Sequence, residues 1–257
     1  MLILLPPSEG KSFPTMGSPV ALSSLSHPEL SDTRRRVGDA LVRLSGTRGA
    51  LAAHGVGPSL EDQVRHNATL WENPSAPAAT VYAGVLYEAA QAASWDSRMQ
   101  ARAHERIRII SALWGAIAPT DKIPAYRLSM TTALPRIGGL ASLWRRHLDA
   151  ALGPLAGDGV VVDCRSSAYV AAWPSIGAPW VAVRVLRERD GTRSVVSHMA
   201  KHTRGLLTAH LLTLETVPQT PSDVADAATT MIGTHLVDLS LVAKAKGPHE
   251  LTLVIGA

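Results

Sequence analysis

Short apolar runs that end in glycine, proline and charged residues set the hydrophobic pattern of this chain. Three of them lie at Leu2 to Leu5, at Ile107 to Leu113 and at residues 159 to 164. Their β-branched content and their length predict buried strands rather than helices. The carboxyl ends of strands in an α/β sheet are where ligand contacts usually gather. We therefore expect the three polar junctions that follow these strands to converge at one sheet edge and form a cleft.

Weaker patterns predict the remaining elements. Strands are expected from Trp180 to Leu186, from Ser194 to Met199 and from Glu250 to Ile255, with an Asp-Gly turn between the first two. Residues 80 to 86 fit either a strand or the start of a helix at Gly84. Together with the helical segments, these strands predict an α/β fold. Helical periodicity is expected at Arg34 to Leu44, 59 to 72, Trp95 to His104, Leu140 to Leu152 and 205 to 214.

Length and composition limit the architecture further. With 257 residues, 46% of them hydrophobic, the chain can bury a substantial core, and we favour a single domain over residues 1–257. No run of about 18 apolar residues is present, and the apolar start is too short for the core of a signal peptide. We therefore expect a cytoplasmic protein that is a monomer and has no membrane partner.

The sequence predicts neither a cofactor nor a metal site. The single cysteine, Cys164, excludes an internal disulfide and a multi-cysteine zinc site, and we interpret it as a small buried residue. His198 and His202 have the i, i+4 spacing that chelates metals on a helix. Because the predicted boundary between a strand and a helix runs between them, this spacing does not support a direct iron site.

The charge pattern permits an anionic partner without requiring one. The net charge is +4 and the isoelectric point is about 9.5, with 20 arginines but only five lysines. A GC-rich coding bias gives the same arginine excess. Arg34 to Arg36 are expected to be a solvated helix start rather than a phosphate patch. Arg98 and Arg102, at i, i+4, either straddle phosphates or are ordinary surface charge.

The candidate chemistry lies in the polar segments. The first junction carries Ser8, Glu9 and Lys11, which fit a solvated polar turn as well as a ligand site. Lys201 and Arg204 lie where a helix is expected to begin, and together with its N-terminus they suit an anion. The other candidates are Lys122, Tyr126 and Arg127 in the central segment and Asp163, Ser166 and Tyr169 after the third strand.

Four segments together resemble the YaaA family of cytoplasmic peroxide-stress proteins. They are the start MLILLPPSEGK, the central ALWGAIAPTDKIPAYRLSM, the junction DCRSSAY and the helix entry AKHTRGL, in matching order and spacing. The resemblance implies a mixed α/β sheet flanked by helices, in the family's topology, with a positively charged cleft. It also implies protection from hydrogen peroxide, and binding of double-stranded or bubble DNA through a helix-hairpin-helix-like element near the central segment.

Two positions depart from the family pattern. Ala118 stands where a familiar family form has arginine before the proline, so a possible phosphate contact is missing. Glu9 brings a carboxylate to where some members have a lysine, and an acidic side chain that faces phosphate repels DNA.

Two functional hypotheses follow. The first, implied by the resemblance, is a stress-response protein that binds DNA through the rim of the cleft. Its contacts are Lys122, Arg127, Lys201 and Arg204, with Arg98 and Arg102 as further candidates. The second is an enzyme that acts on a small anionic or nucleotide-like substrate, because paired acids and bases with a tyrosine suit a pocket better than a duplex track.

The enzyme hypothesis gives each residue a role. Glu9 or Asp163 is the general base, and Tyr126 or Tyr169 donates a proton. The anion is held by Lys11 and Arg127, with Ser8, Ser166, Lys122, Lys201 and Arg204 as further binding residues. A structural alternative treats the same charges as a buried ion-pair network, since such networks also cluster at strand ends.

Overall fold

An eight-stranded mixed sheet organises the protein in a computed structural model that describes residues 1–174 and 179–256. The strand order is β11-β12-β9-β8-β1-β3-β4, and β10 pairs with β9. The strands from β12 to β3 run parallel, whereas β4, β10 and β11 are antiparallel to their neighbours. The predicted α/β fold is thus confirmed. The strands are β1 (Leu2–Leu5), β3 (Ile107–Ser111), β4 (Gly115–Ile117), β8 (Val161–Asp163), β9 (Trp180–Arg189), β10 (Thr192–Val195), β11 (Asp238–Val242) and β12 (His249–Ile255).

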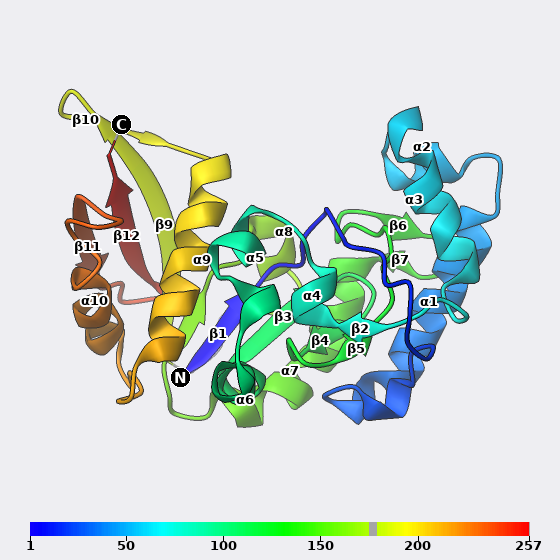
Figure 1. Ribbon diagram of the computed structural model, residues 1–257, viewed down its shortest axis with the longest axis horizontal. Helices are drawn as coiled ribbons and strands as arrows, with labels where there is room; N and C mark the ends of the chain where they lie inside the picture. Colours follow the sequence, from blue (N-terminus) through cyan, green and yellow to red (C-terminus); the bar gives the residue numbers. More distant parts are fainter. Residues whose placement is uncertain (175–178, 257) are drawn as a thin grey trace.

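Helices flank this sheet. Figure 1 shows α5 and α9 together over β1 and β9, whereas α1, α2 and α3 lie at the end of the molecule farthest from α10 and β11. Two small additional sheets pair β2 (Ala76–Pro77) with β5 (Lys122–Ile123) and β6 (Ala133–Leu134) with β7 (Gly138–Gly139). The helices are α1 (Ser31–Ser45), α2 (Ala50–His54), α3 (Glu61–His66), α4 (Ala78–Val81), α5 (Val85–Ala89), α6 (Ser97–Arg106), α7 (Leu140–Ala156), α8 (Ser167–Val170), α9 (His198–Thr213) and α10 (Pro221–Thr229).

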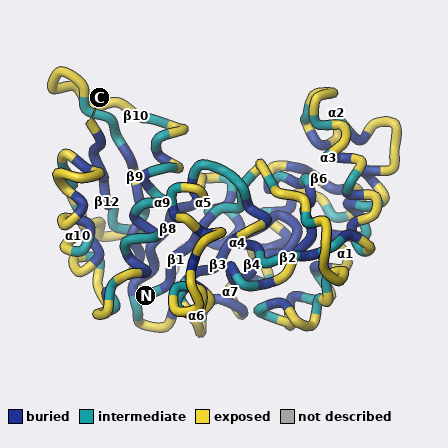
Figure 2. Tube along the Cα trace, viewed as in Figure 1, coloured by how far each residue is buried: buried dark blue, intermediate teal, exposed yellow. Residues whose placement is uncertain are grey.

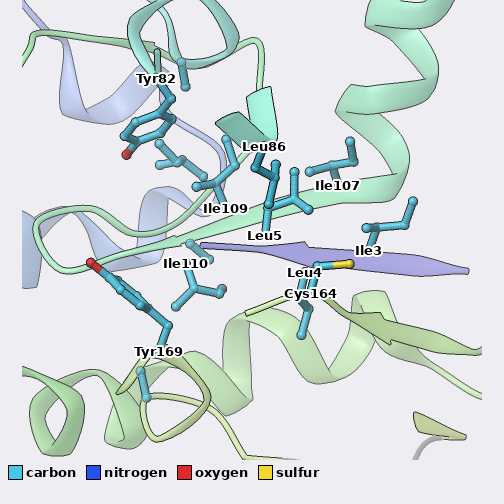
Figure 3. Packing of buried hydrophobic residues seen from close by; sticks show 14 of the residues in the cluster. Ile3, Leu4, Leu5, Tyr82, Leu86, Ile107, Ile109, Ile110, Cys164 and Tyr169 are labelled. Atoms are coloured by element: carbon cyan, nitrogen blue, oxygen red, sulfur yellow. The ribbon is translucent and has the colours of Figure 1, made fainter. Parts of the chain in front are cut away.

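Strand β1 holds the centre of the sheet because apolar neighbours surround it on every side. Ile3 pairs in parallel register with Ile107 of β3 and with Val162 of β8. Side chains alternate across the strand, and Figure 3 shows Leu5 and Leu86 on one side of it and Ile110 and Tyr169 on the other. The carboxyl ends of β1, β3 and β8 therefore meet at one sheet edge, as the sequence predicts.

Buried side chains form one continuous cluster that runs from Leu2 to Ile255. Figure 2 shows this burial along the central strands, with exposure concentrated on the outer helices and on the tip that joins β9 to β10. No helix in the described ranges is both long and apolar enough to cross a bilayer.

Several element boundaries differ from those predicted. β10 ends at Val195 and α9 begins at His198, so the strand predicted to reach Met199 is too long. His198 and His202 consequently lie on the same helix, and the boundary predicted between them is wrong. Residues 80 to 86 form no strand of the sheet, and α5 begins after Gly84, which was one of the two alternatives.

The central segment turns back on itself as a β-hairpin. Gly115 adopts a left-handed backbone with φ of +69°, and a Cβ there would lie 2.6 Å from the Trp144 ring. Asp121 fastens the following loop by accepting hydrogen bonds from Ala118 N and from Ser26 N, each at 3.0 Å. Residues 111 to 130 contain β4, β5 and turns. The helix-hairpin-helix element expected near this segment stays a prediction.

Candidate functional site

A cavity of about 370 Å³ opens at the carboxyl ends of β1 and β8. Its walls come from four regions of the chain: the loop after β1, the segment that enters α5, the junction after β8 and the start of α9. The lining residues are Pro6, Pro7, Ser8, Glu9, Gly10, Ala83, Gly84, Val85, Leu86, Tyr87, Cys164, Ser166, Tyr169, His198, Lys201 and Arg204.

Helix α9 presents three basic side chains to the cavity. His198, Lys201 and Arg204 are spaced by three residues, which keeps them near one face of the helix. Lys201 is exposed and has no carboxylate within ion-pair distance in residues 1–174 and 179–256. The Arg204 side chain donates twice to the Val183 carbonyl oxygen, at 2.7 and 3.2 Å, which fixes its position. Among the described residues, no carboxylate forms an ion pair with it. This wall suits an anion.

The opposite wall is apolar and held in place by hydrogen bonds. Tyr87 donates its hydroxyl to the Pro6 carbonyl oxygen at 2.7 Å, and Ser8 Oγ donates to the Ala83 carbonyl oxygen at 2.9 Å. The close approach depends on Gly84, because a Cβ there would lie 2.3 Å from Ser8 Oγ. Two segments 75 residues apart in the chain thereby form one rigid surface.

Tyr169 lines the cavity, and its hydroxyl group is buried. The residue is only 6% exposed, and its buried Oη has no hydrogen-bond partner in the described part of the chain. Burial raises the pKa of Tyr169, and the nearby charge of Glu9 raises it further. Tyr169 is therefore protonated at neutral pH, and its hydroxyl lies near Ser129 and the Met130 backbone, which lower its pKa in part.

Cys164 lies at the same cavity as a protonated thiol. It is fully buried, and burial raises its pKa to about 12. Because the thiolate is the reactive form, a thiol in this environment is chemically inert at neutral pH. The interpretation of Cys164 as a small buried residue is confirmed.

Glu9, Lys11 and Arg127 form a charged cluster beside the cavity. Arg127 pairs with the Glu9 carboxylate at 3.1 Å, and it approaches the Glu9 carbonyl oxygen at 3.3 Å. Lys11 Nζ donates to the Ser8 carbonyl oxygen at 2.7 Å and lies 4.4 Å from the centre of the Tyr126 ring. Burial lowers the pKa of Lys11 to about 7, Glu9 raises it and Arg127 lowers it. The structure brings these three side chains together, with Arg127 already paired to Glu9, and their predicted roles stay predictions.

Tyr126 belongs to a buried hydroxyl network. Its Oη lies 2.7 Å from Ser111 Oγ and 2.9 Å from Tyr82 Oη. Ser111 Oγ also accepts from two backbone amides, those of Leu113 and Trp114. Because both lone pairs of Ser111 are then used, its hydroxyl donates to Tyr126, which in turn donates to Tyr82. Tyr126 fixes the central hairpin and does not line the cavity.

Asp163 is fully occupied by structural contacts. Arg165 donates to both carboxylate oxygens, at 2.8 and 2.7 Å, and Trp180 donates to one of them at 3.2 Å. The pair is buried and does not line the cavity. Arg165 also reaches the Tyr169 carbonyl oxygen at 3.3 Å. The arrangement matches the structural alternative for this junction, in which the ion pair holds the segment that carries Tyr169.

Other predicted contacts lie outside the cavity. Lys122 is exposed on β5, and the cavity lining does not include it. Arg98 and Arg102 on α6 both pair with Glu215, at 2.6 and 3.0 Å. Arg98 is exposed, whereas Arg102 is largely buried and also donates to the Leu212 and Thr213 carbonyl oxygens. His198 and His202 are one turn apart on α9, but no group of three or more possible metal ligands occurs among the described residues.

Sequence reasoning missed part of the lining. Tyr87, Pro6 and Leu86 form the apolar wall, but nothing in their local pattern distinguishes them from ordinary core residues. The basic face of α9 can be predicted from the sequence, because His198, Lys201 and Arg204 recur every three residues and such spacing places side chains near one face of a helix. Lys201 and Arg204 are among the predicted site residues, whereas His198 is assigned to the preceding strand because the predicted end of that strand is too long.

Comparisons with known proteins cover most of the chain, including the range that contains the cavity lining. The family model for peroxide stress protein YaaA matches residues 1–230. A UPF0246 protein of Streptomyces coelicolor is 39% identical over 255 residues, which cover 97% of this chain and 94% of that protein. UPF0246 proteins of Corynebacterium efficiens and Corynebacterium glutamicum are 38% and 37% identical over 232 residues, which cover 89% of this chain and 91% of each relative.

Proposed function

The chain belongs to the YaaA family of peroxide stress proteins, and from this premise we propose that it is an enzyme whose cavity binds a small anionic substrate. The proposal places this activity in the cytoplasm, as the family resemblance implies. The observation that carries it is the composition of the cavity: basic side chains from α9, apolar side chains from the loop after β1 and from α5, and the protonated Tyr169. Pockets with these features bind small molecules in an oriented way.

Each wall has a separate task in the proposal. Lys201 and Arg204 bind the anionic group, and His198 closes the same wall. The apolar wall around Tyr87 receives a flat, uncharged part of the substrate. Tyr169 donates its hydroxyl proton in a hydrogen bond, and Glu9 is the carboxylate at the cavity that can accept a proton. Acid–base assistance of this kind accelerates reactions by roughly 10² to 10⁴-fold.

Calorimetric titration with inorganic phosphate and adenosine 5′-monophosphate tests the binding site. We expect the nucleotide to bind, and Lys201→Ala to weaken its affinity about tenfold or more, since one charged contact is worth roughly 1.5 to 3 kcal/mol. Lys246→Ala removes another exposed lysine, far along the chain between β11 and β12, and serves as the matched control. Equal affinities of the two variants, or no binding of either probe, would contradict the proposal.

DNA binding through a positively charged cleft is the second candidate. The excess of positive charge, +4 at neutral pH, and the unpaired exposed lysine at the cavity mouth favour it. The salt bridges of Arg98 and Arg102 with Glu215, and of Arg127 with Glu9, reduce the number of cations available to phosphates. The rim then depends mainly on Lys122, Lys201 and Arg204.

Equilibrium binding to short duplex and bubble DNA across a salt series separates the two candidates. A DNA site with three phosphate contacts gives a logarithmic slope of about −2.7 against salt concentration. Glu9→Gln frees Arg127, so DNA affinity should stay equal or increase, whereas turnover of an anionic substrate should be lost. Weak binding with a flat salt dependence would argue against DNA as the main partner.

A further inference from the structure

Strand β11 ends the sheet with an open edge. It pairs with β12 on one side, and within residues 1–174 and 179–256 no strand pairs with its other side. Figure 1 shows β11 at the outer end of the sheet, beside α10. The backbone N–H and C=O groups along this edge can therefore pair with a further strand.

Two other edges of the sheet are less suited to pairing. β4, at the opposite end of the strand order, has three residues, and all of them are buried by the chain's own packing. β10 has four exposed residues, and its Arg193 forms salt bridges with Glu188 and Asp238. β11 has five residues and contains neither proline nor a basic side chain, which are common means of protecting an edge.

The side chains of β11 alternate between the core and solvent. Leu239 and Leu241 are partly buried and pack against the hydrophobic core. Ser240 and Val242 are exposed on the other face, which Asp238 shares. Two leucines thus flank a small polar residue at the middle of the strand.

We propose that β11 pairs with β11 of a second copy of this chain, so that the two sheets join into one across a twofold axis. Such an axis brings the same edge of both copies together in antiparallel orientation. The five residues Asp238–Val242 overlap completely when Ser240 lies opposite Ser240 of the second copy. The sequence alone predicts a monomer, and the open edge of β11 is the reason for departing from that prediction.

This register matches apolar side chains with one another. Leu239 lies opposite Leu241 of the second copy, so two leucine pairs flank the axis on the face that packs against the core. Val237, which is 51% exposed in the single chain, comes opposite Ala243. Pairs of this kind are the contacts that stabilise neighbouring strands.

The charges at the two ends of the segment complement each other. Asp238 begins β11 and Lys244 follows its end, and both side chains are about half exposed. Antiparallel pairing places Asp238 diagonally across from Lys244 of the second copy, within reach of a long side chain, and the twofold axis repeats this contact. No two like charges lie opposite each other between residues 236 and 244. The edge is thus complementary to itself in shape and in charge.

Sedimentation equilibrium of the full chain between about 0.1 and 100 µM tests the proposal. One strand pair is a small interface, so we expect a dimer with a Kd in the micromolar range. Ser240→Lys should raise this Kd about tenfold or more, because it places two like charges opposite each other at the axis. A chain that stays monomeric up to 100 µM, or a dimer that Ser240→Lys leaves unchanged, would overturn the proposal.

Ser194→Lys is the matched control for this variant. It makes the same change at an exposed serine on another edge strand, β10, and should leave the Kd of the dimer unchanged. Both lysine variants should keep the cooperative thermal transition of the unmodified chain, since both serines are exposed. An equal loss of dimer in the two variants would contradict pairing through β11.

A disulfide trap tests the register. Opposite residues of an antiparallel pair have Cα atoms about 4.5 to 5.5 Å apart, which suits a disulfide. Ser240→Cys should therefore form a covalent dimer under mild oxidation, whereas Ser194→Cys should not. The native Cys164 is fully buried and does not interfere. If Ser240→Cys cross-links no faster than Ser194→Cys, the pairing around Ser240 is refuted.

The proposed interface is independent of the proposed function. The cavity lining includes no residue of β11. Ser240→Lys should therefore leave the affinity for adenosine 5′-monophosphate unchanged while it weakens the dimer. Loss of nucleotide binding in Lys201→Ala, with the dimer intact, would separate the two sites from the other direction.

Discussion

The guanidinium of Arg34 is held by four carbonyl oxygens rather than by a carboxylate. It donates to Ser26 and His27 at 2.7 and 3.1 Å, and to Trp114 and Ala116 at 2.9 and 2.8 Å. Its side chain is fully buried, and burial lowers its pKa to about 10, so the group remains charged at neutral pH. The prediction of a solvated helix start is therefore wrong for Arg34, which joins the start of α1 to the central hairpin.

Arg34→Lys should destabilise the protein by about 2 to 4 kcal/mol, because a lysine cannot reach all four carbonyl oxygens and leaves buried acceptors unpaired. Arg36→Lys is the matched control, since Arg36 is exposed on the same helix and should change stability by less than about 0.5 kcal/mol. Urea unfolding monitored by tryptophan fluorescence measures both. Equal unfolding midpoints for the two variants would show that the hydrogen bonds from Arg34 to the four carbonyl oxygens do not stabilise the protein.

At the residue scale, the sequence identified reactive residue types but not their partners. Ser8, Glu9, Ser166, Tyr169, Lys201 and Arg204 do line one cavity. The roles of Tyr126 and Asp163 stay predictions, and both are occupied by contacts that only tertiary structure creates. Asp163 accepts from Trp180, and Tyr126 lies between Ser111 and Tyr82. Neither the composition nor the spacing of residues in the sequence indicates which side chains form these hydrogen bonds.

At the element scale, the cavity exists because α5 and α9 cross very closely. A Cβ at Gly205 of α9 would lie 2.2 Å from the Leu86 carbonyl oxygen and 2.9 Å from Ala89 Cβ. This contact sets the distance between the apolar wall, which α5 carries, and the basic wall, which α9 carries. Glycine in a helix interior weakens the helix, so its presence here is explained by packing.

Gly205→Ala should separate the two helices, destabilise the protein by about 1 to 3 kcal/mol and lower the affinity for adenosine 5′-monophosphate. Gly46→Ala provides a control at the end of α1, because a Cβ there meets nothing closer than 3.8 Å and its φ of −82° suits alanine. Thermal unfolding and calorimetric titration give the two readouts. If Gly205→Ala changes neither the stability nor the affinity for adenosine 5′-monophosphate, the contact between α5 and α9 is not rigid.

The sequence predicted strongly patterned elements well and weakly patterned ones poorly. β1, β3, β8, α6 and α7 follow clear runs or periodicities and lie where expected. β4 and β11 were missed because glycine and alternating polar residues obscure short edge strands. α10 was missed although Thr220 and Asp223 form a capping box, since nearby prolines suggested a loop.

At the scale of the whole molecule, the sheet depends on strands from both ends of the chain. β12 pairs with β9 over seven residues, from His249 to Ile255, although the match to the family ends at residue 230. Leu251 and Leu253 are fully buried, and each such side chain contributes about 1.5 to 3 kcal/mol. The final strands are therefore part of the fold.

Truncation after Met231 should expose the edge of β9 and cause aggregation, because an unpaired hydrophobic strand is a template for other chains. Light scattering and the loss of a cooperative thermal transition detect this outcome. Truncation after Ile255 leaves β12 complete and should unfold like the full chain. A cooperative monomer that ends at Met231 would mean that β11 and β12 are dispensable.

The central position of β1 has a consequence for how the protein is made. β1 pairs with β3 and with β8, and Leu2 pairs with Val161, so β1 leaves the ribosome long before its last partner is synthesised. At 5 to 20 residues per second, this delay lasts roughly 10 to 30 s. During that time the segment Leu2–Leu5, which is wholly buried in the finished sheet, lacks this partner and faces solvent or a chaperone. Newly made chains are thus most vulnerable to aggregation before β8 emerges.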